Sequence, residues 1–476
     1  MVVSYPATDR RGGFRSILKA VNVEPVAEYV RRNRMMAHDA VPGEDSCPKR
    51  FTIPYLRWWI GGLLFMMTVI NYIDRQTLGA LSPYLKEEFG WTNEDYAFIL
   101  NSFRVAYTIM QSVFGRVLDI IGTYRGLSMS VTFYSVIAAL TALAQGKMSF
   151  AVFRFFLGCG EAANNPGGSK AVSEWFPAKE RAWAVALFDS GSSIGGALAP
   201  FIVVAIYAWF DSWRPAFLIT ATLGVFWLIL WRWLYRLPEE HPHISAEELA
   251  YIKAGRSSDP LSIEQQPRIR WGRLLRYRQT WGIVLGRFLL DPYWFFMAEW
   301  FALYLKSKGF SLEASALGFW APFLGADLGN FFGGGLSSWM IQRGMPVGRS
   351  RRTVLLIFGP SMLVLALTAF TNNYYLLLLL FAYASFAYAC CSTMFLTLPT
   401  DVFHSRAVGS VMGLGGTGAG IGALISTYLI GRISEQISFE PIIIAASIIP
   451  CAATAVFVTL VRAGKTPDPE GVVLHF

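Results

Sequence analysis

The sequence predicts an all-α membrane protein with twelve transmembrane helices in two six-helix halves, and three observations support this. The chain of 476 residues is 54% hydrophobic and 15% charged, whereas soluble domains are about 25% charged. Its apolar residues gather in runs of about 20, the length that a helix needs to cross a bilayer. Lys and Arg, which give a net charge of +9, lie mainly between those runs, so they are typical of topology signals and require no nucleic-acid partner.

Twelve apolar runs follow one another, six on each side of a polar segment. The first six lie near residues 56–78, 96–117, 126–145, 149–174, 183–207 and 215–235. The second six lie near residues 280–305, 314–341, 352–371, 374–399, 408–433 and 440–461. We therefore predict an N-terminal bundle over 55–235, a cytoplasmic central loop over 236–279 and a C-terminal bundle over 280–462.

The two ends of the chain are polar. Residues 1–54 are basic and contain no apolar run long enough for a signal peptide, so we expect a disordered cytoplasmic tail. Residues 463–476 are expected to form a second cytoplasmic tail. Because Met35 and Met36 lie just before the first run, we also hypothesise that translation begins there, without residues 1–34.

Basic residues are divided unevenly between the two sides of the predicted bundle. The loops on the side of the N-terminus carry most of them, including Arg268, Arg270, Arg273, Arg276 and Arg278. The opposite loops carry only Lys86, Lys147, Arg214, Lys306 and Lys308. Because cytoplasmic loops carry an excess of Lys and Arg, both termini are predicted to lie in the cytoplasm.

The first and fourth runs each contain a pair of charged residues. Asp74 and Arg75 close the first run, whereas Arg154 and Glu161 lie seven residues apart in the fourth, on nearly the same helical face. A charged side chain at membrane depth costs roughly 2.5–3.5 kcal/mol on insertion scales, so it usually pairs, faces a wet cavity and serves function. The four side chains predict a polar site between helices. Alternatively, Arg75 snorkels to the interface, and Arg154 and Glu161 form a structural pair.

The chain offers no pattern typical of catalysis or metal binding. Its five Cys show no CxxC spacing, and its five His lie outside the predicted spans, so a proton relay would have to use carboxylates. The Gly-rich run 413–420 lacks the Lys of a phosphate-binding loop and lies in an apolar span, which favours helix packing. We expect no enzyme activity, cofactor or metal, and 236–279 is too short for a sensor domain.

Several motifs resemble those of a known family of carriers. Four residues after the second span are spaced as in the gating loop of the major facilitator superfamily: Gly115, Asp119, Gly122 and Arg125. Three further runs are similar to the anion:cation symporter family: 71–75, 158–163 and 173–181. Within that family, the runs most similar to bacterial hexuronate transporters are 173–181, 191–195, 278–282 and 291–294. The second half departs from the pattern, because it has Ser338 and Trp339 where the family usually has an acid and a base.

The resemblance implies a proton-coupled symporter in the bacterial inner membrane that imports a sugar acid by alternating access. It implies that Asp74 and Glu161 carry the proton, and that Arg75 and Arg154 bind the substrate carboxylate or pair with these acids. The implied substrate is a hexuronate such as glucuronate or galacturonate. Galactonate, glucarate or another organic anion remains an alternative, and we expect a monomer in the lipid bilayer.

The resemblance also implies that Tyr72 and Tyr107 line the cavity and bond sugar hydroxyls. Asn71 is four residues before Arg75 and can share its helical face. Arg104 is not expected from the resemblance; it shares a face with Tyr107, so it lies either at the cavity entrance or at the interface with lipid headgroups.

Two acids elsewhere in the spans have no assigned role. Asp189 and Asp327 could line the cavity or make structural hydrogen bonds.

Overall fold

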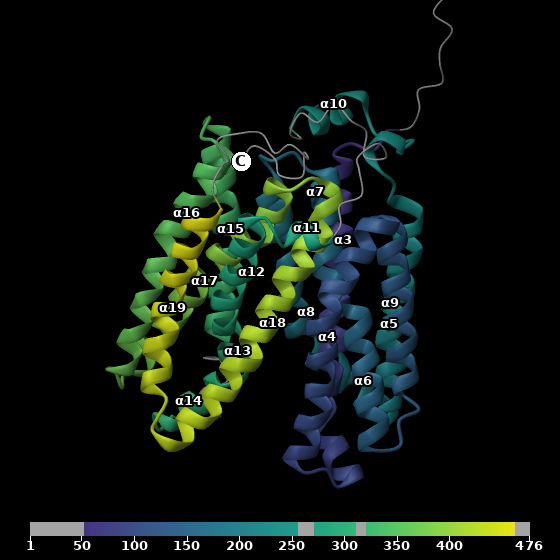
Figure 1. Ribbon diagram of the computed structural model, residues 1–476. Helices are drawn as coiled ribbons and strands as arrows, with labels where there is room; N and C mark the ends of the chain where they lie inside the picture. The colour runs from purple at the N-terminus through teal and green to yellow at the C-terminus, as the bar shows by residue number, and fades with distance from the viewer. Residues whose placement is uncertain (1–51, 256–270, 311–319, 462–476) are drawn as a thin grey trace, which may run out of the picture. The chain divides into compact units, whose positions relative to one another are not determined.

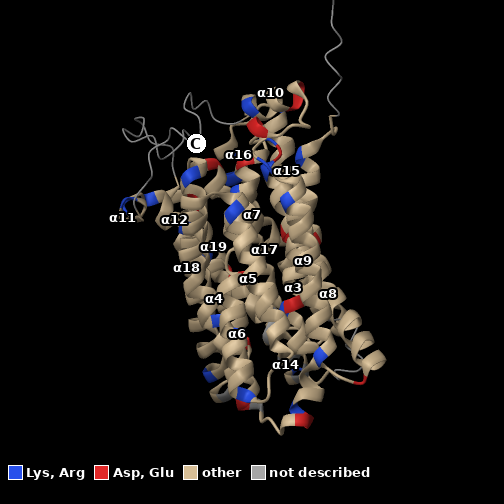
Figure 2. Cartoon of the chain, turned by 90° about the vertical axis from the view of Figure 1, so that its right-hand side faces the viewer, with Lys and Arg blue, Asp and Glu red and all other residues tan. Residues whose placement is uncertain are grey.

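The computed structural model describes residues 52–255, 271–310 and 320–461, in which helices are joined by short connections (Figure 1). The predicted tails lie outside the described residues apart from 52–54, as does the hypothesised start. Charged residues lie mainly toward the ends of the helices, and most of the length between consists of uncharged residues (Figure 2).

The helices follow the order of the predicted spans. Those of the N-terminal half are α3 (Leu56–Phe89), α4 (Asn93–Ile121), α5 (Thr123–Thr141), α6 (Lys147–Glu161), α7 (Asn164–Trp175), α8 (Arg181–Phe210) and α9 (Arg214–Leu234). The connecting segment contains η1 (Pro238–Glu240), α10 (Ala246–Gly255) and α11 (Trp271–Leu274). Those of the C-terminal half are α12 (Arg278–Leu290), α13 (Pro292–Glu299), α14 (Phe301–Ser307), α15 (Trp320–Gln342), α16 (Val347–Ser361), η3 (Met362–Ala369), α17 (Tyr374–Val402), α18 (Ser405–Gln436) and α19 (Glu440–Leu460).

Seven helical segments in the described ranges are each long and apolar enough to cross a membrane: α3, α8, α9, α16 with η3, α17, α18 and α19. The other predicted spans are either more polar, as in α4, α5 and α15, or divided into shorter helices. Over their described residues, all twelve predicted spans are therefore helical, although they differ in how continuous and how apolar they are.

A proline lies at one break in each of three divided spans. Pro166 has no N–H, and its ring clashes with the carbonyl group four residues earlier, at the turn between α6 and α7. Pro292 begins α13 in the same way, and Pro360 lies where α16 gives way to the 3₁₀ segment η3. The polypeptide is thus bent within the bundle rather than only between its helices.

The first helix is longer than its predicted run. α3 continues to Phe89, with Leu78, Leu81 and Leu85 fully buried on one face. Its end is set by Gly90, whose φ of 63° is readily adopted only by glycine. The prediction that Asp74 and Arg75 close the span is therefore wrong, because the apolar stripe resumes after them and leaves them inside the helix.

The start of α4 is fixed by polar side chains outside the predicted span. Thr92 and Asp95 form a reciprocal capping box, in which the Thr92 hydroxyl accepts from the Asp95 N–H at 3.1 Å. A hydrogen bond from the Lys147 ammonium at 2.6 Å lowers the pKa of Asp95 to about 2. Asp95 thus keeps its charge beside the positive end of the helix dipole.

Small residues allow helices of the two halves to approach closely. A Cβ atom at Gly115 of α4 would lie 2.2 Å from the carbonyl oxygen of Gly409 in α18. A Cβ atom at Gly413 would lie 2.3 Å from the carbonyl oxygen of Gln111. The Gly-rich run 413–420 therefore serves helix packing, as predicted.

Part of the predicted central loop packs on the N-terminal half. Arg57 at the start of α3 forms ion pairs with Glu180, at 2.7 Å, and with Glu248 of α10, also at 2.7 Å. Ile252 of α10 is fully buried in the hydrophobic core of that half. This helix is therefore anchored by both charge and apolar contact.

Candidate functional site

The four charged residues predicted to form a polar site lie together, on α3 and α6. Arg75 donates through Nη2 and Nε to Oε2 of Glu161, at 3.1 and 3.2 Å. Arg154 donates through Nη1 to the backbone carbonyl of Arg75 at 3.0 Å. Asp74 lies within electrostatic range of both Glu161 and Arg154 and next to Thr220 of α9. The predicted grouping is therefore present in the structure.

Burial separates these side chains into two kinds. Asp74, Arg154 and Glu161 are almost completely buried, whereas 21% of the Arg75 side chain remains exposed. Within the described part of the chain, Oε1 of Glu161 and both carboxylate oxygens of Asp74 are buried and accept no hydrogen bond of normal geometry. Because buried polar groups are normally satisfied, this concentration of incompletely bonded carboxylates is typical of a functional site.

Aromatic rings surround the Arg75 guanidinium. Its central carbon lies 4.6 Å from the ring centre of Tyr72, 4.7 Å from that of Tyr107 and 5.0 Å from that of Phe103. Such cation–π contacts are favourable, and more so when the cation is desolvated. The Asn71 side-chain oxygen accepts a further hydrogen bond from Nη2 at 3.3 Å. The structure thus brings Asn71, Tyr72 and Tyr107 to Arg75.

Phe103 is a member of this site that the sequence analysis missed. It stacks on Tyr107 at 5.6 Å, one helical turn away on α4. Its spacing from Tyr107 could have revealed it. Arg104, the next residue, is half-buried, and the structure does not distinguish its two predicted roles.

A second buried ion pair, in the C-terminal half, was also missed. Arg287 donates to Oδ2 of Asp291 through Nε at 3.0 Å and Nη2 at 2.9 Å. Tyr107, from the other half, lies within electrostatic range of Arg287. The spacing of four residues in the run 280–305 was a usable signal, because oppositely charged residues so placed share a helical face. Arg287 thus faces toward the same region as Arg75.

Asp189 and Asp327 lie where α8 meets α15. Asn330 of α15 donates to Asp189 at 3.2 Å and accepts a hydrogen bond from Thr393 at 2.9 Å. Asp189 is also within electrostatic range of Tyr72 and Arg287. Asp327 is half-buried, near Ser193. Asp189 therefore makes a polar contact between the halves, beside the Arg75 and Arg287 clusters.

The predicted gating loop contacts the other half through Asp119. Its carboxylate accepts from the Lys170 ammonium at 2.8 Å and from the backbone N–H groups of Gly409 and Ser410 at 3.1 and 2.7 Å. Gly115 provides the close approach described above, and Gly122 has a φ of 83° that favours glycine. Arg125, by contrast, lies on an exposed face of α5.

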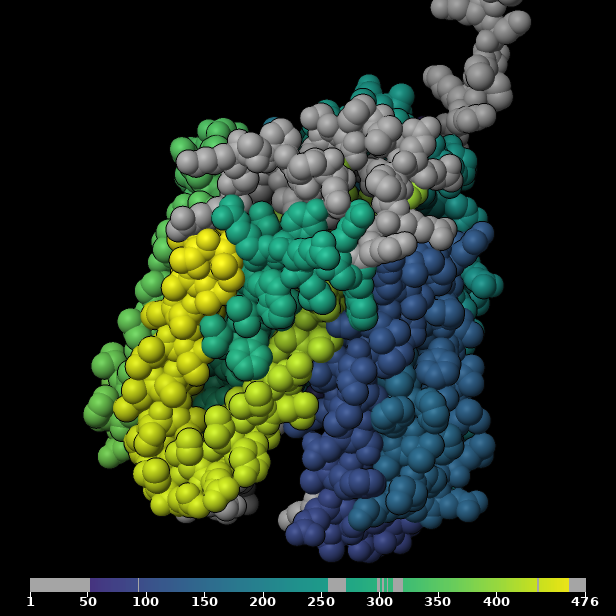
Figure 3. Space-filling model, in the orientation of Figure 1, coloured from purple at the N-terminus to yellow at the C-terminus, as the bar shows by residue number. Residues whose placement is uncertain are grey.

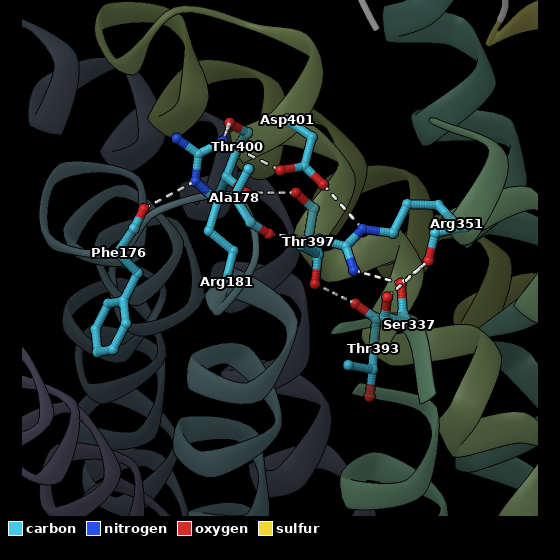
Figure 4. A network of polar contacts seen from close by, with 10 residues as sticks. Phe176, Ala178, Arg181, Ser337, Arg351, Thr393, Thr397, Thr400 and Asp401 are labelled. Carbon is cyan, nitrogen blue, oxygen red and sulfur yellow. Dashed lines mark hydrogen bonds and ion pairs between the residues drawn. The ribbon is translucent and has the colours of Figure 1, made fainter. Parts of the chain in front are cut away.

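A second network joins the halves at the same end of the bundle (Figure 4). Asp401 of α17 accepts from Arg181 of α8 at 3.1 Å and from Arg351 of α16 at 3.0 Å. Arg181 also donates to the carbonyl of Thr400 at 2.6 Å, and Arg351 donates to Ser337. All three charged side chains are buried. Asp401 thus supplies an acid to the second half, although position 338 is serine.

The opposite ends of the same helices are separated. Figure 3 shows a hollow between the C-terminal end of α18 and the N-terminal end of α4. The Asp119 and Asp401 contacts lie at the other end, which carries the arginine-rich connections. The halves are therefore closed at the arginine-rich end and open at the other.

The chain matches known proteins over most of its length. A model of the Major Facilitator Superfamily matches residues 64–427 and 344–473. The hexuronate transporter of Escherichia coli (strain K12) is 38% identical over 395 residues, which cover 81% of this chain and 90% of that protein. The galacturonate transporter of Dickeya chrysanthemi is 39% identical over 360 residues, covering 74% and 98% respectively.

A solved structure has the same fold at low sequence identity. The transporter FucP, crystallised in the outward conformation, superposes with a TM-score of 0.62 at 16% identity, covering 84% of this chain and 97% of that one. Together with the family match, this likeness confirms the predicted all-α fold with twelve transmembrane helices in two halves.

Proposed function

The chain belongs to the Major Facilitator Superfamily, and from that membership we propose that it is a proton-coupled symporter importing a hexuronate such as glucuronate or galacturonate. It is an integral multi-pass membrane protein. We further propose the bacterial inner membrane, with both termini in the cytoplasm. The observation that carries this proposal is the partly exposed Arg75, held by Glu161 among aromatic rings.

Substrate binding is assigned to Arg75, with Arg154 supporting it. A guanidinium presents paired N–H groups that match a carboxylate. Arg154 donates a hydrogen bond to the backbone carbonyl of Arg75, so it positions the segment of α3 that carries the Arg75 side chain. Tyr72, Tyr107 and Asn71 offer hydroxyl and amide groups to the sugar ring.

Proton coupling is assigned to Glu161 and Asp74. While Glu161 is charged, it occupies Arg75, and its protonation leaves that guanidinium available to the substrate carboxylate. Asp74 is within electrostatic range of Glu161, so a proton on either acid relieves repulsion between them. A single ion pair can thereby make anion binding depend on proton binding.

Alternating access is assigned to the contacts between the halves. Asp119, through the backbone N–H groups of Gly409 and Ser410, and Asp401, through its ion pair with Arg181, hold the arginine-rich end closed while the opposite end is open. Gly115, Gly122 and Arg125 belong to the same proposed gating loop. Import then requires these contacts to break as the halves rock about the site.

Uptake into proteoliposomes tests the proposal. Labelled glucuronate and galacturonate are expected to accumulate when an inward proton gradient is imposed, and only to equilibrate without one. Unlabelled galactonate, glucarate and an aromatic acid are expected to compete weakly. Strong competition by one of these would reassign the substrate, and absence of counterflow with every acid would contradict a carrier function.

A further inference from the structure

A groove lies on the outer face of the N-terminal half, along α5, with Arg232 of α9 at one end. Its volume is about 510 Å³. It is lined by Tyr124, Arg125, Ser128, Met129, Thr132, Phe133, Val136 and Arg232. Figure 1 shows α5 and α9 side by side, at the margin of the helices of this half. This α5–α9 groove is separate from the site around Arg75, because no residue of that site lines it.

One end of the groove is cationic. Arg125 lies near the start of α5 and Arg232 in the last turn of α9, and both are exposed. Within the described ranges neither guanidinium forms an ion pair with a carboxylate. Arg236 adds a third positive charge nearby, since it lies 5.2 Å from the ring centre of Tyr124. This end therefore suits an anionic group.

The rest of the groove is apolar. Met129, Phe133 and Val136 are 47%, 38% and 51% exposed. The hydroxyls of Ser128 and Thr132 donate to carbonyls of their own helix at 2.7 and 2.8 Å, so they need no polar ligand. The lining therefore changes from charged to apolar along the helix.

The length of the groove matches one leaflet of a bilayer. From Arg125 to Val136 the helix rises about 16 Å, at about 1.5 Å per residue. The hydrocarbon core of a bilayer is about 30 Å thick, so one leaflet spans about half of that. A soluble anion would use only the arginines, whereas a lipid would use the apolar length as well.

We propose that the α5–α9 groove binds an anionic glycerophospholipid. The phosphate lies between Arg125 and Arg232, and one acyl chain lies along Met129, Phe133 and Val136. Charge complementarity selects anionic over zwitterionic headgroups. The bound lipid lies along α5 on the membrane side, with its headgroup beside Arg232 of α9.

Native mass spectrometry of the purified full-length protein tests this, with phosphatidylglycerol and phosphatidylcholine as probes. R125Q/R232Q is expected to bind phosphatidylglycerol roughly 30-fold more weakly, because each basic residue near an anionic headgroup contributes about fivefold. R343Q/R349Q removes two exposed arginines from the arginine-rich end of the other half and is expected to bind like the wild type. The single variants R125Q and R232Q are expected to bind phosphatidylglycerol more weakly than the wild type and more tightly than R125Q/R232Q.

A second variant tests the apolar part without changing charge. Met129→Trp fills the groove and is expected to release phosphatidylglycerol, while soluble glycerol phosphate is expected to displace none. Equal weakening by both double variants, equal binding of the two lipids, or displacement by glycerol phosphate would overturn the proposal. Unchanged lipid binding in Met129→Trp would also overturn it.

Discussion

At the scale of single residues, Glu161 combines complete burial with a hydrogen bond to only one of its two oxygens. Glu161→Gln keeps the shape but cannot exchange a proton, so we expect gradient-driven accumulation to fall to simple equilibration while counterflow persists. Asp74→Asn is expected to lose accumulation as well. The measurement is uptake and counterflow of labelled hexuronate in proteoliposomes.

The matched control is Glu240→Gln, which removes an exposed carboxylate outside the bundle and is expected to leave accumulation intact. We expect counterflow to survive in at least one of the two acid variants. Full concentrative uptake by both would show that these acids do not carry the coupled proton.

The residues of the site could be predicted from the free-energy cost of charged side chains in apolar runs and from their spacing along the helix, but the ion pairs that they form could not. Charges in apolar runs singled out Asp74, Arg75, Arg154 and Glu161, because such residues are expensive in lipid. Which acid meets which arginine depends on how α3 packs on α6. Arg287 was not predicted as a site residue, although it lies in an apolar run four residues before Asp291, a spacing that also indicates a charged pair.

At the scale of helices, the approach of α4 to α18 depends on the absence of a side chain at Gly115. We expect Gly115→Ala to lower the free energy of unfolding by about 1–3 kcal/mol, as overpacking does in well-packed interiors. Its Cβ would lie 2.2 Å from the carbonyl oxygen of Gly409, which as backbone cannot move alone. The measurement is thermal unfolding of the purified protein in detergent.

Gly62→Ala is the matched control on α3. No described atom beyond its own neighbourhood lies within 4 Å of the added Cβ, so the change should act through helix propensity alone. We expect it to stabilise the protein by about 0.5–1 kcal/mol. Equal effects of the two substitutions would mean that α4 and α18 do not need close contact.

Element order could be predicted well because each span carries its own apolar signal. The extension of α3 to Phe89 could not, because charged residues interrupt the run before its buried leucines resume. The breaks at Pro166 and Pro292 were visible in the sequence, but a proline can be absorbed without a break, as Pro200 is inside α8. Only the packing around each proline decides between these outcomes.

At the scale of the whole molecule, Asp401 is the shared partner of an arginine from each half. Asp401→Asn removes the carboxylate that Arg181 and Arg351 share, and breaking a buried ion pair costs about 3–5 kcal/mol. We expect the arginine-rich end to open more often. The measurement is the rate at which a permeant maleimide alkylates Ser410→Cys, a position that is fully buried in this closed state.

Glu440→Gln provides the control, since it breaks the Lys308–Glu440 ion pair, which lies within one half. In this control, the cysteine introduced by Ser410→Cys is expected to be alkylated at the same rate as in the protein that carries Ser410→Cys alone. A rate in Asp401→Asn no faster than in this control would mean that the network does not hold the halves together.

The division into two halves could be predicted from the polar segment between the sixth and seventh runs. The polar contacts between them could not, because Asp119 accepts hydrogen bonds from Gly409 and Ser410, and Asp401 pairs with Arg181, which all lie far away in the sequence. The uneven distribution of Lys and Arg predicted which end of the bundle is rich in arginine, but it gave no sign that Arg181 and Arg351 at that end are buried. Their burial depends on the docking of one half against the other.

The attachment of α10 through Arg57 and Ile252 gives the N-terminal half a rigid extension outside the bundle. Lys253 on this helix is exposed, as is Arg349 on α16 of the other half. A spin label at Lys253 would move rigidly with the N-terminal half, because α10 is anchored to that half, and one at Arg349 would move with the C-terminal half. The pair would therefore report the separation of the two halves. The distance between them would record each transport cycle from a single pair of sites.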